Sequence, residues 1–227
     1  MALPSGRDQQ NMIPMSRKGE AGIPSPAALG FRAHSGWAVL ITVAGSATAT
    51  EALVVIDRRR IELVEPGSPE TVQPYHTAAR LGPKQAEAFI KNCAERARLL
   101  AIQALRAVID HLSATGHQVV ASGILLSSGR PTTDLAATLA SHALIHTAEG
   151  HLFREALTRA SEHHHLPVMG LRERELFRRA SAELGTSPDE VRRRVAALGH
   201  QLGPPWRQDE KHAALVAWLA LASRFQR

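Results

Sequence analysis

The chain has 227 residues, which is enough for one domain of ordinary size with a substantial buried core. Hydrophobic residues make up 44% of the sequence and charged residues 21%, a balance that excludes collagen-like, wholly disordered and disulfide-rich proteins. The 27 Lys and Arg residues outnumber the 21 Asp and Glu residues, and the formal net charge of +6 favours anionic partners. Cys93 is the only cysteine, so no internal disulfide forms, and we expect a cytoplasmic protein.

Neither a membrane span nor an export signal is expected from the sequence. The longest apolar runs, around residues 37–44 and 213–222, fall well short of the roughly 20 residues that a membrane helix needs. Residues 1–28 contain repeated Pro and Gly but no continuous apolar segment of the kind found in signal peptides, so we predict a disordered leader. Residues 29–227 are predicted to form a single domain.

Three short strands are predicted in the first part of this domain. Residues 36–44 are nearly all apolar and rich in β-branched side chains, as in a strand covered on both faces. Residues 51–57 and 60–64 follow as the second and third strands, and their order favours an antiparallel meander. Several prolines and glycines interrupt residues 65–82, which we predict to be a loop.

Helices dominate the rest of the chain. Apolar residues keep helical spacing from Pro83 to Gly116, and residues 118–126 then form a continuous, largely apolar run that indicates a buried strand. Two helical stretches are predicted within residues 135–160, divided near residues 147–150. The remaining predicted elements are a short strand at residues 167–169 and helices at 173–184, at 188–198 with Ser187 as the N-cap, and at 210–225.

The predicted order of elements is β-β-β-α-β-α-β-α with additional helices, and three short segments stand at particular points of it. These are LGFRAHSGWAVL at residues 29–40, TAEGHLFR at 147–154 and DEKHAAL at 209–215. In this order, over roughly residues 30–222, they resemble the RuvC-type Holliday-junction resolvases of the ribonuclease H-like superfamily. The resemblance implies an α/β fold with a five-stranded mixed sheet, and phosphodiester hydrolysis assisted by Mg²⁺ or Mn²⁺.

The sequence departs from the family pattern at two of its metal-binding carboxylates. Arg32 stands at the position of the first-strand Asp, and a guanidinium cannot coordinate a cation because it has donors and no usable lone pair. Ser122 and Gly123 stand where the family has a Glu in the fourth strand. Asp209 and His212 match the closing motif and, at a spacing of three residues, share one helix face. We therefore expect a diverged and catalytically impaired resolvase-like protein.

Candidate site residues follow from this resemblance and from the basic segments. If the protein is an active metal-dependent nuclease, Glu149, Asp209 and His212 are the candidate catalytic and metal-binding residues. The triplet at residues 58–60 lies between two predicted strands, where a tight hairpin would project positive charge. The candidate nucleic-acid-binding residues are Arg32, Arg58, Arg59, Arg60, Arg154 and Lys211. The other arginines of residues 172–194 alternate with acids, which is typical of a solvated helical surface.

Histidines near Glu149 form a second group of interest. If one helix continued through residues 141–154, His142, His146 and Glu149 would share a face that can bind zinc or hold a proton-transfer pair. The glycine within this segment weakens helical continuity, and we favour a polar cluster that faces a cleft. His34 and His146 are further cleft candidates.

Two classes of function remain open at this point, with a third behind them. The leading hypothesis is binding of structured or double-stranded nucleic acid, DNA or RNA, through the basic surface. The alternative is a non-catalytic protein-interaction or scaffold domain, because a fold does not guarantee its chemistry. The third is a small-molecule enzyme with His146 and Glu149 as a base-acid pair. Salt dependence separates the first two, since binding to phosphates weakens steeply with added salt.

Overall fold

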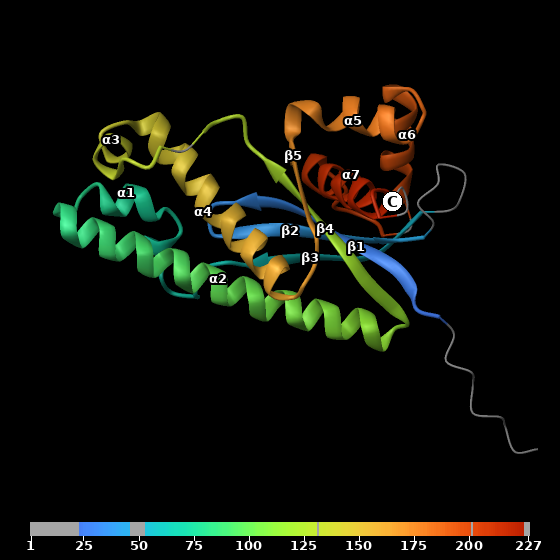
Figure 1. The fold of residues 1–227 in the computed structure, drawn as a ribbon, viewed down its shortest axis with the longest axis horizontal. Helices are drawn as coiled ribbons and strands as arrows, with labels where there is room; N and C mark the ends of the chain where they lie inside the picture. The colour runs from blue at the N-terminus through green and yellow to red at the C-terminus, as the bar shows by residue number, and fades with distance from the viewer. Residues whose placement is uncertain (1–22, 46–52, 131, 201, 225–227) are drawn as a thin grey trace, which may run out of the picture.

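The computed structural model describes residues 23–45, 53–130, 132–200 and 202–224, so most of the predicted leader lies outside the described residues (Figure 1). A twisted five-stranded sheet has the order β3-β2-β1-β4-β5. Neighbours β1, β2 and β3 pair antiparallel, whereas β4 is parallel to both β1 and β5. This mixed sheet confirms the predicted α/β class. The strands are β1 (Ser25–His34), β2 (Trp37–Ala44), β3 (Val54–Glu62), β4 (His117–Leu126) and β5 (Val168–Arg172).

The strand boundaries at the N-terminal end differ from the prediction. The predicted first strand is β2, and the true first strand, β1, includes residues 25–28 that were assigned to the leader. Pro26 lies ahead of the antiparallel ladder with β2, which begins at Ala27, so its missing N–H breaks no bond of that ladder. The predicted strands at 51–57 and 60–64 are instead one strand, β3, so the arginine triplet lies inside a strand rather than in a hairpin tip. As the edge strand, β3 exposes charged side chains to solvent.

Helices cover both faces of the sheet. The long helix α2 and helix α4 pack on one face, against Leu29, Phe31 and Ile124, while α7 packs on the other face against Ala28 and β2. Figure 1 shows α5 and α6 outside α7, so this side of the sheet has two helical layers. The helices are α1 (Pro74–Ala78), α2 (Pro83–Ala114), α3 (Leu135–Leu139), α4 (His142–His163), α5 (Leu176–Glu183), α6 (Pro188–Leu198) and α7 (Gln208–Ala222), with short 3-10 turns at Pro69–Thr71 and Glu173–Glu175. In the described residues, no helix is both long and apolar enough to span a membrane.

Local signals set most helix boundaries correctly. Ser187 caps α6, as predicted, by accepting a hydrogen bond from the Glu190 amide at 3.2 Å. The predicted division near residues 147–150 is wrong, because α4 continues through Gly150 and the break falls just before Ser141, the N-cap of α4. The predicted loop 65–82 contains the short helix α1.

Two glycines in the central strands allow α7 to lie directly on the sheet. Gly30 in β1 and Gly123 in β4 are neighbours in the parallel ladder. A Cβ atom at Gly30 would lie 1.9 Å from the Ala213 carbonyl oxygen, and one at Gly123 would lie 2.5 Å from the Val216 carbonyl oxygen. Any side chain at these two positions would therefore push the helix backbone away from the sheet.

A methyl group at Gly30 should destabilise the protein. We expect Gly30→Ala to lower the free energy of unfolding by at least about 2 kcal/mol, because the clash is with backbone that cannot rotate away. Urea denaturation measures the change. Gly82→Ala is the control, since its Cβ would meet only Gln85 Oε1 at 3.7 Å. Equal unfolding midpoints for wild type and Gly30→Ala would contradict this account.

Candidate functional site

The carboxyl ends of the parallel strands β1 and β5 and the start of α7 bring polar residues together on the α7 side of the sheet. Leu29 and Phe31 of β1 point into the core beneath α2 and α4, so by strand alternation Arg32 and His34 face α7. Loops and side chains at the carboxyl ends of parallel strands form the usual ligand-binding edge of α/β sheets. Glu173, the first residue after β5, reaches the same place.

Five side chains form one network there, which we call the Arg32 group: Arg32, His34, Glu173, Asp209 and His212. Nη1 of Arg32 forms a close ion pair with Glu173 Oε2, and its Nε lies 3.4 Å from Asp209 Oδ1. Nε2 of His34 lies 2.9 Å from Asp209 Oδ2, and Nδ1 of His212 lies 3.3 Å from Glu173 Oε1. Each carboxylate is therefore shared between the guanidinium and one imidazole.

His212 is the most buried member of the Arg32 group. Only 8% of the residue is exposed, and its ring packs edge-on against Phe177 with 5.7 Å between the ring centroids. Burial lowers the pKa of His212 from its ordinary value of 6.5; the charges of Glu173 and Asp209 oppose this shift, and that of Arg32 adds to it. The neutral imidazole is therefore favoured near pH 7.

The residues present do not fit the divalent-metal site that the family resemblance implies. A Mg²⁺ or Mn²⁺ ion needs several converging oxygen ligands, but both carboxylates here face the Arg32 guanidinium. An acidic side chain at Gly123 is excluded by the α7 backbone. The neighbouring Ser122 is fully buried, and its hydroxyl has no hydrogen-bond partner among the described residues.

Glu149 lies with a different set of residues. It is on α4, which packs on the opposite face of the sheet from α7. Its Oε1 lies 2.8 Å from His76 Nδ1 and accepts a hydrogen bond from the His76 amide at 3.2 Å, and its Oε2 lies 3.9 Å from His146 Nδ1. The structure thus brings Asp209 and His212 together but places Glu149 elsewhere. Of the two further cleft candidates, His34 joins the Arg32 group and His146 joins Glu149.

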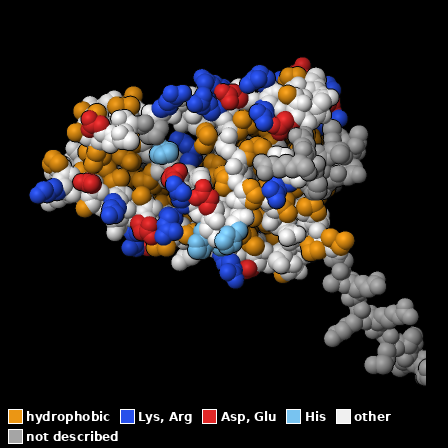
Figure 2. Space-filling view, in the orientation of Figure 1, with side chains coloured by type: hydrophobic (Ala, Val, Ile, Leu, Met, Phe, Trp, Pro, Cys, Tyr) orange, Lys and Arg blue, Asp and Glu red, His pale blue; other side chains and the backbone are white. Residues whose placement is uncertain are grey.

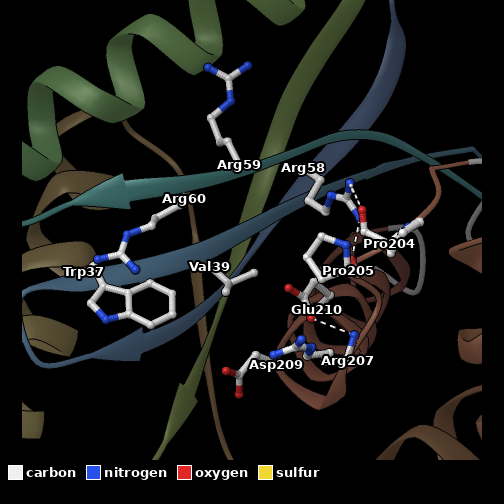
Figure 3. A pocket seen from close by; sticks show the side chains of 10 residues that line it. All are labelled: Trp37, Val39, Arg58, Arg59, Arg60, Pro204, Pro205, Arg207, Asp209 and Glu210. Carbon is white, nitrogen blue, oxygen red and sulfur yellow. Dashed lines mark hydrogen bonds between the residues drawn. The ribbon is translucent and has the colours of Figure 1, made fainter.

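The arginine triplet of β3 is engaged within the protein. Figure 3 shows Arg58 directed at the segment before α7, where it donates hydrogen bonds to several carbonyls, including that of Gly203 at 2.9 Å. Arg60 lies over the Trp37 ring, 3.9 Å from its centroid, and pairs with Glu62. Arg59 points to the other side of the strand and pairs with Asp57 at 2.7 Å. These residues border a cavity of about 690 Å³, lined by Trp37, Val39, Arg58, Arg59, Arg60, Pro204, Pro205, Arg207, Asp209 and Glu210.

Two of the predicted phosphate contacts have no carboxylate partner among the described residues: Arg154 and Lys211. Arg154 Nη2 donates a hydrogen bond to Ser127 Oγ at 2.9 Å, just beyond the end of β4. Burial, and then the charge of Arg32, lowers the pKa of Arg154 to about 10, so the guanidinium is still positive at neutral pH. Lys211 lines a second cavity of about 420 Å³ beside Phe177 and His212.

The arginines of α5 and α6 form a mixed surface, in agreement with the sequence. Figure 2 shows Lys and Arg side chains along the upper edge of the molecule, with Asp and Glu among them. Arg179 pairs with Glu183, and Arg192 pairs with Asp189 at 2.9 Å. Exposed pairs of this kind add little to stability and leave little uncompensated charge.

Sequence reasoning missed the roles of Glu173 and His76. In the sequence, Glu173 is one of the acids that offset nearby arginines, although its place at the junction between a predicted strand and a predicted helix is a usable signal. His76 belongs to the polar and aromatic group at residues 73–76, which makes the predicted loop 65–82 a candidate for function or a mere connection. Nothing local to these residues indicates a contact with Glu149, 73 residues further along the chain.

The comparisons with known proteins agree with this architecture. The Thermus thermophilus RuvC structure matches with a TM-score of 0.50 and 13% identity, covering 88% of this chain and 96% of that chain. T. thermophilus RuvC in complex with a Holliday junction substrate matches with a TM-score of 0.50, 14% identity and the same coverage. No protein-family model and no curated protein matches the sequence. The chain has a RuvC-like, ribonuclease H-like fold.

The lowered pKa of His212 predicts a pH dependence of stability. The unfolded state binds a proton near pH 6.5 and the folded state binds it only at lower pH, so the free energy of unfolding falls as the pH drops below about 6.5. His212→Asn should lose less stability than wild type between pH 7.5 and 5.5, measured by urea denaturation. The exposed His163→Asn is the control and should follow wild type. If His212→Asn showed the same pH dependence as wild type, the attribution of this dependence to His212 would be refuted.

Proposed function

We propose that the protein is a diverged RuvC-like domain that binds structured or double-stranded nucleic acid and whose nuclease chemistry is impaired. The observation that carries the proposal is the pairing of Arg32 with both Glu173 and Asp209. A fixed cation takes the position that, in a nuclease of this fold, a first-strand Asp and its metal would share. The fold and the basic balance of the chain support nucleic acid as the partner, and a single free thiol, Cys93, supports a cytoplasmic location.

Impaired catalysis follows from the charges of the Arg32 group. We infer that the family's first-strand Asp has been lost at Arg32 and its fourth-strand Glu at Ser122 and Gly123. Asp209 and His212 keep the positions of the closing motif, but the Asp209 carboxylate is held by Arg32 and His34. Without converging carboxylates to bind metal ions, neither activation of water nor neutralisation of the phosphate is supplied.

Arg154 and Lys211 are the phosphate contacts that we propose. A phosphate can accept two hydrogen bonds from one guanidinium, and binding releases counterions from the nucleic acid. Arg154 is partly buried beside the positive Arg32, so a bound anion would offset the repulsion between the two guanidinium groups. Arg58 is a poorer candidate, because backbone carbonyls already hold its guanidinium.

A gel-shift series tests both halves of the proposal. Labelled four-way junction and linear duplex are each mixed with the protein in Mg²⁺, Mn²⁺ or chelator. We expect a shifted complex without cutting, and an affinity that falls steeply with added salt. Metal-dependent cutting that Asp209→Asn abolishes would overturn the claim of impaired catalysis. Neither a shift nor cutting at low salt would refute nucleic-acid binding and favour the protein-interaction alternative.

Arg154→Ala should weaken binding to both substrates. Loss of one phosphate contact should reduce the slope of log K against log salt concentration by about 1. Arg106→Ala is the matched control, because Arg106 is exposed on α2 and pairs with Asp110. An unchanged salt slope in Arg154→Ala would remove Arg154 from the interface.

Arg32→Asp should create affinity for Mn²⁺ near Glu173 and Asp209. The substitution removes the competing guanidinium and adds a third carboxylate to the same place. Calorimetric titration should detect an additional Mn²⁺ ion relative to wild type, and adding Asp209→Asn to the variant should weaken it. No gain over wild type would show that Arg32 does not suppress metal binding.

A further inference from the structure

Three histidines from two helices meet on the α4 side of the sheet. His76 belongs to α1, and His142 and His146 lie in the first turns of α4. One ring nitrogen from each lies within 4.8 Å of the others. The ring centroid of His76 lies 5.4 Å from that of His142 and 4.9 Å from that of His146. These two pairs and the pair His142–His146 are all edge-on.

The spacing of His142 and His146 suits one metal ion. They are four residues apart on a helix and so share a face. Their Nε2 atoms lie 3.0 Å apart. Two nitrogens bound to the same tetrahedral Zn²⁺, each at about 2.0–2.1 Å, would lie roughly 3.3 Å apart, so only a small adjustment is needed.

Glu149 supplies the support that a histidine ligand requires. The residue is 1% exposed, and its Oε1 is 2.8 Å from His76 Nδ1. A carboxylate that accepts the Nδ1 proton fixes the tautomer and leaves the Nε2 lone pair free to bind a metal. The other carboxylate oxygen, Oε2, is buried and has no hydrogen-bond partner among the described residues. A buried carboxylate is costly unless a positive charge lies nearby, and a divalent ion would provide one.

We propose that His76, His142 and His146 bind a zinc-class divalent ion through their Nε2 atoms, with Glu149 as the positioning residue behind His76. Three imidazoles are ligands typical of Zn²⁺ and related transition metals rather than of Mg²⁺. His142 and His146 are exposed, so the fourth coordination position is open to solvent. The ion would join α1 to the start of α4. The site is separate from the Arg32 group and does not depend on nucleic-acid binding.

Metal titration of the full chain tests the proposal. After removal of metals with chelator, Zn²⁺ is titrated by calorimetry and Co²⁺ by its visible absorption, which is intense for tetrahedral sites. We expect one ion per chain, and loss of that ion in the double variant His142→Ala with His146→Ala. Both side chains are exposed, so this variant should keep its fold, checked by circular dichroism. Glu149→Gln should retain one ion with an affinity about 10–100-fold lower.

The histidine run after α4 provides the matched control. The double variant His163→Ala with His165→Ala also removes two histidines, at exposed positions near the other end of the helix. It should bind Zn²⁺ as wild type does. No binding to wild type, unchanged binding in the His142→Ala, His146→Ala variant, or loss of the ion in the control variant would each overturn the proposal.

Discussion

The contact between α7 and the two central strands determines where the polar residues of this protein lie. Gly30 and Gly123 let the α7 backbone pack directly on the sheet, because a side chain at either position would collide with a carbonyl of α7. Because α7 packs so close to the sheet, its first turn lies next to the end of β1. Asp209 and His212 are thereby brought to Arg32, and burial beneath the neighbouring helices lowers the pKa of His212.

The Arg32 group balances most of its charge internally. One guanidinium faces two carboxylates, so the positive charge of Arg32 is already compensated within the group. A phosphate would therefore gain little attraction from Arg32. The proposed nucleic-acid binding would therefore depend on cations outside the group, such as Arg154, whose charge interacts with that of Arg32. For this reason, the proposed loss of catalysis and the proposed binding of nucleic acid are physically compatible.

Sequence patterns predicted the elements whose signals are local. The α2 and β4 segments and the Ser187 cap follow from apolar spacing and capping chemistry within a few residues. The strand β1 was missed because Pro26 and Gly30 resemble chain breakers, although one lies near the strand's start and the other makes room for a helix. The order of the three family-like segments identifies Arg32, Asp209 and His212 as candidate site residues. No such segment identifies Glu173 or His76, and the residues that they contact lie far away in the sequence.

The Arg32 group and the cluster around Glu149 compensate the negative charge of their carboxylates in different ways. In the Arg32 group the carboxylates are about a third exposed and contact a permanent cation. Water and the Arg32 guanidinium therefore both stabilise their negative charge. Glu149 is almost fully buried. Its ion-pair partners are His76 and His146, which carry a positive charge only when they are protonated. A divalent ion bound at the proposed histidine site would offset this charge. Within the described residues no ion pair joins the two groups, so a change in one need not alter the other.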